Sequence, residues 1–138
     1  MTDTPLLYQC LIAVRWGDMD SYAHVNNTQY LRYLEEARIQ WFAQIGIDLQ
    51  DAPQGPVLLQ VQHSFLRPVQ YPATLRVQLH AGDLGRSSLV LQHRLYLQDD
   101  PTLLGEGYCK LVWIEHASAR STALPEQLRA QWPVMPAS

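Results

Sequence analysis

The sequence predicts an α+β fold, in which a mainly antiparallel sheet carries one long helix. Apolar residues recur at helical spacing in a single long segment, whereas later segments alternate apolar and polar residues with a period of two. Short turns separate those later segments, which excludes a repeating β-α-β chain with a parallel sheet. A chain of 138 residues has the size of one domain, so residues 1–138 are expected to form a single one.

The first half of the chain predicts a strand, a polar loop and the long helix. Residues 8–16, "YQCLIAVRW", form a mostly apolar run that ends at Gly17, as expected for a strand broken by a turn. The loop "GDMDSYAHVNN" follows, and the helix is expected over residues 28–45, with Gly46 ending it. Its apolar stripe consists of Tyr30, Leu34, Ala37, Trp41 and Ile45.

The second half predicts four strands and a short helix. In residues 57–69, Val57, Leu59, Val61 and Phe65 alternate with polar residues, which indicates a half-buried strand. Similar alternation predicts strands around residues 74–79, 89–97 and 103–115, and the turns between them contain "AGDLG" and "QDDP". The segment "LPEQLRAQW" predicts a short helix that starts at Pro125. The sheet is therefore expected to have five strands.

Composition limits the possible partners. The chain is 47% hydrophobic and 17% charged, and no apolar run approaches the roughly 20 residues of a bilayer span. No secretory signal pattern begins the sequence, so we expect no membrane contact and a cytoplasmic location. A net charge of −3 disfavours nucleic-acid binding. Cys10 and Cys109 are expected to be free thiols of a reducing compartment, and no ligand cluster predicts a metal.

The loop before the helix has two possible roles. Asp, Ser and Asn residues often precede helices because their side chains bond free backbone N–H groups, which makes Asn26 or Asn27 a candidate cap. A helix start also stabilises negative charge, and the loop brings Asp18 and Asp20 close to it. A carboxylate there can attack a carbonyl or activate water. His24 is open to either a structural or a proton-transfer role.

The segment "DMDSYAHVNNTQYLRYLEEAR", residues 18–38, resembles the acyl-CoA thioesterases of the hotdog superfamily, in particular the 4-hydroxybenzoyl-CoA and long-chain acyl-CoA thioesterase-like branch. Members of that branch show a D-x-D-x-x-x-H-V-N-N-x-x-Y pattern followed by L-E-E-A-R. The resemblance implies a hotdog fold, with a five-stranded antiparallel sheet wrapped around the central helix. It also implies hydrolysis of acyl-CoA to a free acid and coenzyme A, without a cofactor because coenzyme A is part of the substrate.

The resemblance assigns roles to individual residues of the loop. It makes Asp20 the catalytic carboxylate and Asn27 the position whose backbone N–H polarises the thioester carbonyl. A related group uses an Asp, Asn and His spaced two apart, which match Asp20, Tyr22 and His24. Tyr22 departs from that pattern, so His24 is expected to orient water or substrate and Asp18 to be structural.

Two further glutamates in the motif are not expected to react. Another hotdog branch places a catalytic glutamate in the central helix after a His-Gly-Gly loop, and that loop is absent here. Glu35 and Glu36 are therefore predicted to be structural and to pair with Arg32 or Arg38 at helical spacing.

The resemblance also suggests where the substrate binds. Arg86 occupies a position where the family often has a basic residue for the nucleotide phosphates, with Ser87 and Ser88 as hydrogen-bond donors and Arg67 as a weaker candidate. Arg86 can equally be a solvated turn residue. Tyr30 is expected either to line the acyl pocket or to fill the core.

Alternatives from other classes stay open at this level. The chain could be a hotdog module that binds acyl-CoA or a partner without hydrolysis, or a hydratase of the same fold. A sheet curled around one helix leaves edges to cover, so we expect a homodimer or homotetramer. The family site lies at such an interface.

Overall fold

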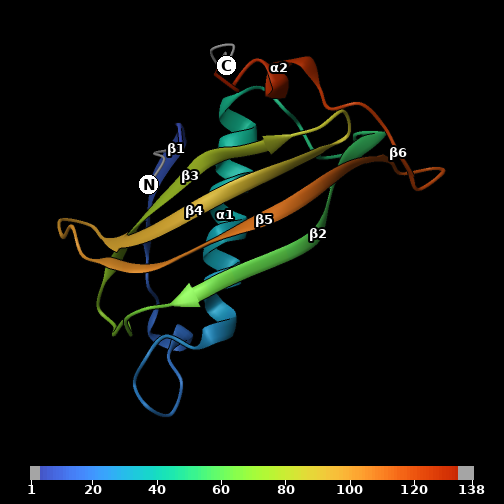
Figure 1. The fold of residues 1–138 in the computed structure, drawn as a ribbon. Helices are drawn as coiled ribbons and strands as arrows, with labels where there is room; N and C mark the ends of the chain where they lie inside the picture. The colour runs from blue at the N-terminus through green and yellow to red at the C-terminus, as the bar shows by residue number, and fades with distance from the viewer. Residues whose placement is uncertain (1–3, 134–138) are drawn as a thin grey trace.

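The computed structural model describes residues 4–133, and within them one sheet and one long helix dominate the fold (Figure 1). The helical elements are a 3-10 turn at Trp16–Asp18, α1 at Asn27–Gln44 and α2 at Glu126–Arg129. The strands are β1 (Leu6–Ala13), β2 (Gln54–Phe65), β3 (Thr74–Leu84), β4 (Ser88–Leu97), β5 (Leu103–Glu115) and β6 (Arg120–Ser121).

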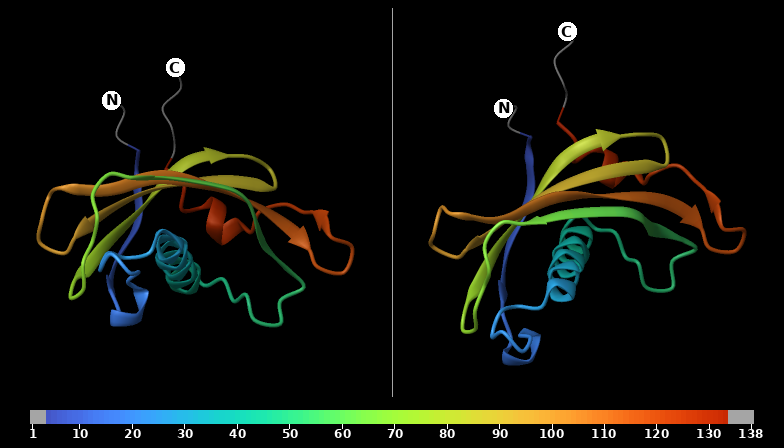
Figure 2. Two further views of the ribbon diagram at one scale, coloured as in Figure 1. Left: turned by 90° about the horizontal axis from the view of Figure 1, so that it is seen from below. Right: turned by 60° about the horizontal axis from the view of Figure 1, so that its bottom comes forward.

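The sheet has the order β1-β3-β4-β5-β2, and all of its pairs are antiparallel. It arches over α1, which runs along its concave face (Figure 2). This arrangement confirms the predicted hotdog fold. The sequence analysis did not anticipate β6, a two-residue strand that pairs with the end of β5 through a turn in which Ala119 has a φ of 59°. Such a short strand gives no period to detect.

The helix α1 begins and ends where its sequence predicts, to within one residue. Asn26 is the N-cap, because its side chain accepts a hydrogen bond from the Thr28 amide. Gly46 follows the helix with a φ of +85°, a left-handed conformation that suits glycine. The buried face of α1 consists of Tyr30, Tyr33, Leu34, Ala37, Arg38, Trp41 and Phe42.

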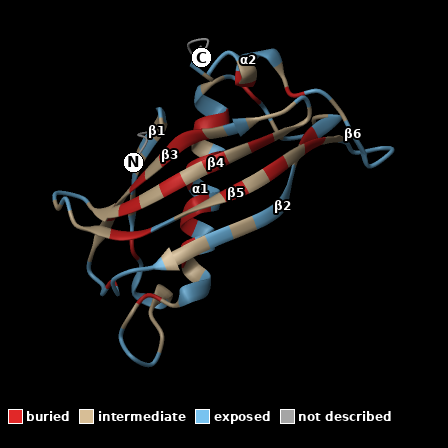
Figure 3. Cartoon of the chain, viewed as in Figure 1, coloured by how far each residue is buried: buried red, intermediate tan, exposed pale blue. Residues whose placement is uncertain are grey.

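The core lies between this face and the central strands. In β3 and β4 buried residues alternate with less buried ones, and Leu75, Val77, Leu89 and Leu91 have no exposed surface (Figure 3). These side chains meet the helix because residues of equal parity share one face of a strand. The alternation predicted for both strands is therefore confirmed.

The strand β2 corrects one prediction. Val57, Leu59 and Phe65 were expected on a half-buried face, but their exposed fractions are 39%, 58% and 50%. Two features explain the difference. β2 is an edge strand of the sheet, and a register shift between Leu58 and Gln60 interrupts its alternation. A long apolar edge is therefore left uncovered in the single chain.

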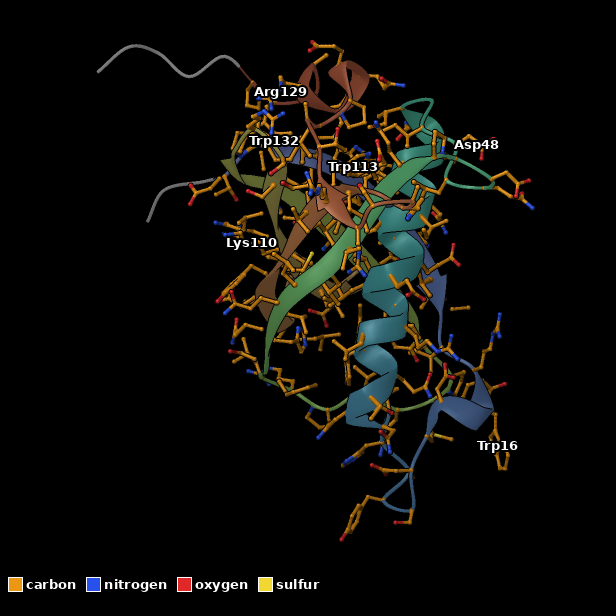
Figure 4. All side chains as sticks on the ribbon, turned by 90° about the vertical axis from the view of Figure 1, so that its right-hand side faces the viewer. Trp16, Asp48, Lys110, Trp113, Arg129 and Trp132 are labelled. Carbon is orange, nitrogen blue, oxygen red and sulfur yellow. The ribbon has the colours of Figure 1, made fainter. Side chains whose placement is uncertain are left out.

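The C-terminal helix α2 fixes the end of the sheet farthest from the polar loop. Leu128 is fully buried, and Trp132 Nε1 donates a 2.8 Å hydrogen bond to the Gly82 carbonyl. Arg129 donates to the carbonyls of Gly85 and Arg86. Figure 4 shows Arg129 and Trp132 at one end of the molecule and Trp16 pointing outward at the other. None of the helices in residues 4–133 combines the length and the apolar character that crossing a membrane requires.

Candidate functional site

The loop before α1 folds back on itself as a short hairpin. Met19 and Val25 form an isolated antiparallel bridge, and the Asp18 carbonyl accepts the amide of Asn26 at 2.9 Å. The Asp20 amide donates to the His24 carbonyl at 2.8 Å, and Ala23 turns the chain with a φ of 60°. Asp20 is thereby held at a defined place just before the helix.

Asp18 is tied into the surrounding structure. Its Oδ2 accepts hydrogen bonds from the Arg15 amide at 2.9 Å and from the Tyr33 hydroxyl at 2.6 Å. Burial and the Asp18 carboxylate both raise the pKa of Tyr33, so the phenol stays protonated and remains a donor. These bonds connect the loop to the second turn of α1 and agree with the structural role predicted for Asp18.

Asp20 has a different arrangement. Its Oδ1 accepts hydrogen bonds from the amides of Tyr22 at 2.8 Å and His24 at 3.4 Å. No donor within residues 4–133 reaches its Oδ2. One carboxylate oxygen therefore fixes the orientation of the group, and the other is open to a substrate or a water molecule.

The first turn of α1 leaves a backbone donor open next to this loop. Asn26 caps the helix through its side chain, which accepts from the Thr28 amide and hydroxyl, and its carbonyl accepts from the Gln29 amide. The amide of Asn27 has no acceptor among the described residues. An unpaired N–H at a helix start can stabilise an anion, and the oxyanion role of Asn27 stays a prediction.

His24 and Tyr22 do not complete a triad with Asp20. Tyr22 is 81% exposed, and only its amide contacts the Asp20 carboxylate. The His24 side chain lines a hollow of about 610 Å³ together with residues of the β2–β3 connection, including Pro68, Val69 and Gln70. Tyr22, which departs from the pattern of the related group, therefore gives Asp20 no side-chain partner. A proton-transfer role for His24 stays a prediction.

Tyr30 lies in the core, in an aromatic cluster that the sequence analysis did not assemble. Its ring is 4% exposed and contacts His63 at 5.4 Å and Phe65 at 5.3 Å between centroids. His63 Nδ1 in turn lies 2.8 Å from His93 Nε2. A signal was available for His93, which has the parity of the buried Leu95 and so points inward, whereas the alternation of β2 gave none for His63.

The histidine pair is kept neutral by its surroundings. Burial, with contributions from His63 and Arg38, lowers the pKa of His93 to about 3. Burial also lowers the pKa of His63. His63 stacks on Tyr30 in the first turn of α1. Through this contact the neutral pair supports the start of the helix.

The predicted nucleotide-binding residues lie at the opposite end of the same chain. Arg86 and Ser87 lie in the turn between β3 and β4, which α2 holds through Arg129, and Ser88 is the first residue of β4. β3 starts beside the polar loop and has 11 residues, so this turn is roughly 30 Å away along the strand (Figure 1). Arg86 is exposed, whereas Ser87 and Ser88 are half-buried.

The predicted ion pairs of Glu35 and Glu36 are absent from residues 4–133. Glu36 accepts a hydrogen bond from Gln40 Nε2 at 2.7 Å, and the Arg38 side chain turns inward to Cys109. Helical spacing alone would allow Arg38 to pair with one of these glutamates. Arg38 does not do so because it lies on the buried side of the helix.

Comparisons with known proteins agree with this fold. The family model of the thioesterase-like superfamily matches residues 14–132. The long-chain acyl-CoA thioesterase FadM of Escherichia coli is 26% identical over 130 residues, which are 88% of this chain and 93% of FadM.

Two solved structures are similar over most of their length. The PA2801 protein of Pseudomonas aeruginosa, a candidate thioesterase, is 60% identical with a TM-score of 0.89, covering 91% of this chain and 97% of that one. A candidate acyl-CoA thioesterase of Xanthomonas campestris is 36% identical with a TM-score of 0.77, covering 86% and 99%. The chain therefore belongs to the thioesterase-like superfamily and is a hotdog-fold thioester hydrolase.

Proposed function

We propose that this chain hydrolyses acyl-CoA thioesters, with medium or long fatty acyl groups favoured, at the loop before α1. Asp20 is the reacting carboxylate, as nucleophile or general base, and the Asn27 amide is the oxyanion donor. The acyl preference is supported by the similarity to FadM, whose name specifies long-chain acyl-CoA. Aromatic acyl groups are the second choice.

One observation carries this proposal. Asp20 is anchored by Oδ1 through two amides of its own loop, and its Oδ2 has no donor within residues 4–133. A catalytic carboxylate needs both a fixed position and an open oxygen, and Asp20 meets both conditions. Asp18 also keeps one oxygen without a donor in these residues, but its other oxygen is bonded to the Tyr33 hydroxyl of α1, which gives this acid a role in joining the loop to the helix.

The chemistry requires little more than positioning. As a general base, Asp20 takes a proton from water while the water oxygen bonds to the thioester carbon. The carbonyl oxygen becomes negative opposite the Asn27 amide, and the C–S bond then breaks to give the free acid and the thiol of coenzyme A. As a nucleophile, Asp20 forms an anhydride that water then cleaves.

A homodimer or homotetramer is part of the proposal. Asp20 and Arg86 lie toward opposite ends of β3, whose 11 residues span roughly 30 Å, and this separation supports a site in which the two come from different copies. The exposed apolar edge of β2 supports pairing with a second copy. We expect sedimentation to give at least twice the chain mass of 15.8 kDa. A mass of one chain at micromolar concentration would contradict the shared site.

The test of the activity is a thiol-release assay with acyl-CoA substrates from acetyl to palmitoyl, together with benzoyl-CoA and phenylacetyl-CoA. We expect the highest kcat/KM for a medium or long fatty acyl group. An aromatic optimum would correct the substrate class. Binding of acyl-CoA without thiol release from any substrate would favour a non-hydrolytic binding module instead.

A further inference from the structure

The hydrogen bonds that Asp20 makes within residues 4–133 all lie in its own loop. Its Oδ1 accepts from the amides of Tyr22 and His24, its amide donates to the His24 carbonyl at 2.8 Å, and its carbonyl accepts from the Ala23 amide at 3.1 Å. We call residues 20–24 the hairpin tip, which lies below the start of α1 in Figure 1. These bonds fix the shape of the tip, but they do not fix its place relative to the helix.

The base of the hairpin is joined by backbone bonds to two neighbouring segments. The Asn26 amide, at the helix cap, donates to the Asp18 carbonyl at 2.9 Å. The Val25 amide donates at 2.8 Å to the carbonyl of Val69, in the connection between β2 and β3. The tip follows this base, so the position of Asp18 is one of the points that decide where the tip lies.

One side-chain bond joins the base to the body of α1. The Tyr33 hydroxyl donates to Asp18 Oδ2 at 2.6 Å, the short length typical of a hydroxyl bonded to a carboxylate. No other side-chain hydrogen bond in the described part of the chain joins residues 17–25 to this helix. The link therefore depends on a single hydroxyl group of the second helical turn.

The Tyr33 ring is well suited to hold this group in place. It is 5% exposed and packs edge-to-face against Tyr30, with ring centroids 6.0 Å apart. A tyrosine side chain has few rotatable bonds, so burial of the ring also fixes its hydroxyl. Because burial and the Asp18 carboxylate both raise the pKa of Tyr33, the hydroxyl keeps its proton and stays a donor.

We propose that Tyr33 is a positioning residue for thioester hydrolysis, an inference that rests on the proposed function. By holding Asp18, it keeps the hairpin tip at a fixed place relative to the helix start. The Asp20 carboxylate belongs to the tip and the Asn27 amide to the helix, yet both must act on one thioester carbonyl. A displacement of about 1 Å between such groups can lower the rate about 10²-fold. Tyr33 bonds to neither reacting group, so it acts through Asp18.

The first experiment measures kcat and KM for thiol release by Tyr33→Phe, which removes the hydroxyl and keeps the ring. We expect kcat to fall about tenfold or more, while KM changes less than about threefold because the variant affects the alignment of the reacting groups. Tyr8→Phe is the matched control. It removes a 3.1 Å hydrogen bond from a tyrosine hydroxyl to Gln40, in the last turns of the same helix, and should keep the wild-type kcat.

A double-mutant cycle tests whether Tyr33 acts through Asp18. Asp18→Ala removes the acceptor, so the addition of Tyr33→Phe to this variant should lower kcat no further. Asp18→Asn keeps an oxygen that can accept from the Tyr33 hydroxyl and should retain most of the wild-type kcat. Losses that multiply in the double variant would show that the two residues act separately and would contradict the proposal.

Hydrogen exchange followed by NMR tests the same link without any enzymatic activity. In Tyr33→Phe the Asn26 amide, whose acceptor is the Asp18 carbonyl, should exchange about tenfold faster than in the wild type. The Asp20 amide is bonded inside the tip and should change less. Unchanged exchange of the Asn26 amide would show that the tyrosine does not hold the hairpin base, and it would overturn the inference.

The kinetic outcomes separate this inference from the proposed function. Normal turnover in Asp20→Asn would overturn the proposed function, and this inference with it. A large loss of turnover in Asp20→Asn together with the wild-type kcat in Tyr33→Phe would overturn this inference alone. So would a rise of KM in Tyr33→Phe without a fall in kcat, because Tyr33 would then contribute to substrate binding and not to the alignment of Asp20.

Discussion

The first turn of α1 and its last two turns differ in almost every physical respect. At the start, Asn27 and Thr28 are exposed, the cap is polar and one backbone donor is open. Toward the end, Trp41 and Phe42 have exposed fractions of 0% and 2%, and Phe42 packs edge-to-face against Trp113 with centroids 5.7 Å apart. One helix thus has an open polar end, where we propose the chemistry, and a closed apolar end.

This difference teaches that the position of a substitution along α1 should decide which property it changes. Changes near the last turns should lower the free energy of unfolding, because they remove buried apolar area. Changes at the open end should lower the free energy of unfolding by less than changes near the last turns, and changes to the reacting groups there should lower turnover. The histidine pair, which lies under the first turn of α1 through Tyr30, should couple stability to pH.

The largest loss of stability is expected for Trp41→Ala. The side chain is fully buried, and truncation of a buried aromatic residue typically costs about 3–5 kcal/mol. Urea unfolding monitored by circular dichroism measures this loss. Ile39→Ala is the matched control, since Ile39 is 47% exposed on the same helix and should cost less than about 1 kcal/mol. Equal losses at both positions would contradict the conclusion that buried apolar packing near the last turns of α1 stabilises the fold.

The pH dependence of stability is expected to come partly from His93. Its folded-state pKa of about 3 lies below the ordinary histidine pKa of 6.5, so the unfolded chain binds more protons between these values. Stability is therefore complete above pH 6.5 and falls as the pH drops toward 3, by at most about 1.4 kcal/mol per pH unit from this group.

Urea unfolding of His93→Asn at several pH values checks this slope. The variant should show a shallower decline between pH 6.5 and pH 4 than the wild type, whatever its stability at neutral pH. His116→Gln, which changes an exposed histidine, should keep the wild-type slope. Parallel curves for wild type and His93→Asn would show that His93 does not provide this coupling.

A smaller loss of stability is expected for Asp18→Ala. Two hydrogen bonds to the carboxylate disappear, from the exposed Arg15 amide and the Tyr33 hydroxyl, and the loss of the partner of this part-buried hydroxyl should cost about 1–3 kcal/mol. Tyr33→Phe removes only the second bond and should cost less. The thermal midpoint measures both, and an unchanged midpoint in Asp18→Ala would contradict a structural role for this acid.

The smallest effect is expected for the helix cap. Asn26→Ala removes the bonds to the Thr28 amide and hydroxyl and should cost about 1 kcal/mol. Asn26→Asp retains a side-chain acceptor and should recover most of the loss. In Asn26→Ala, turnover should fall only if loss of the cap displaces the open Asn27 amide. Asn26→Asp keeps the cap, so its turnover should stay close to that of the wild type. A large loss of turnover in Asn26→Asp would show that this side chain has another role.

Much of the fold follows from local patterns in the sequence. The period of 3.6 in residues 28–45 and the alternation in β3 and β4 reflect one buried face each, and these elements are confirmed. Edge strands are less predictable. The alternation of β2 suggested a buried face, but burial depends on what lies beside the strand, and the single chain places nothing there.

The candidate site was predictable only in part, for the same reason. The role of Asn26 as a cap is a local property, and it is confirmed. The contact of His63 with His93 and the burial of Arg38 against Cys109 join segments that lie far apart in sequence. Helical spacing made Arg38 a predicted partner of Glu35 or Glu36, whereas its angular position on α1, close to Leu34, puts it inside.

The central claim is that hydrolysis occurs at the open end of α1 through Asp20. The most direct test is the rate of thiol release from a saturating acyl-CoA substrate by Asp20→Asn, compared with Asp18→Asn as the matched acid of the same loop. We expect Asp20→Asn to lose about 10²–10⁴-fold in kcat with an unchanged unfolding midpoint, and Asp18→Asn to lose less than tenfold. Near-normal turnover in Asp20→Asn, or an equal loss in both variants, would contradict this account.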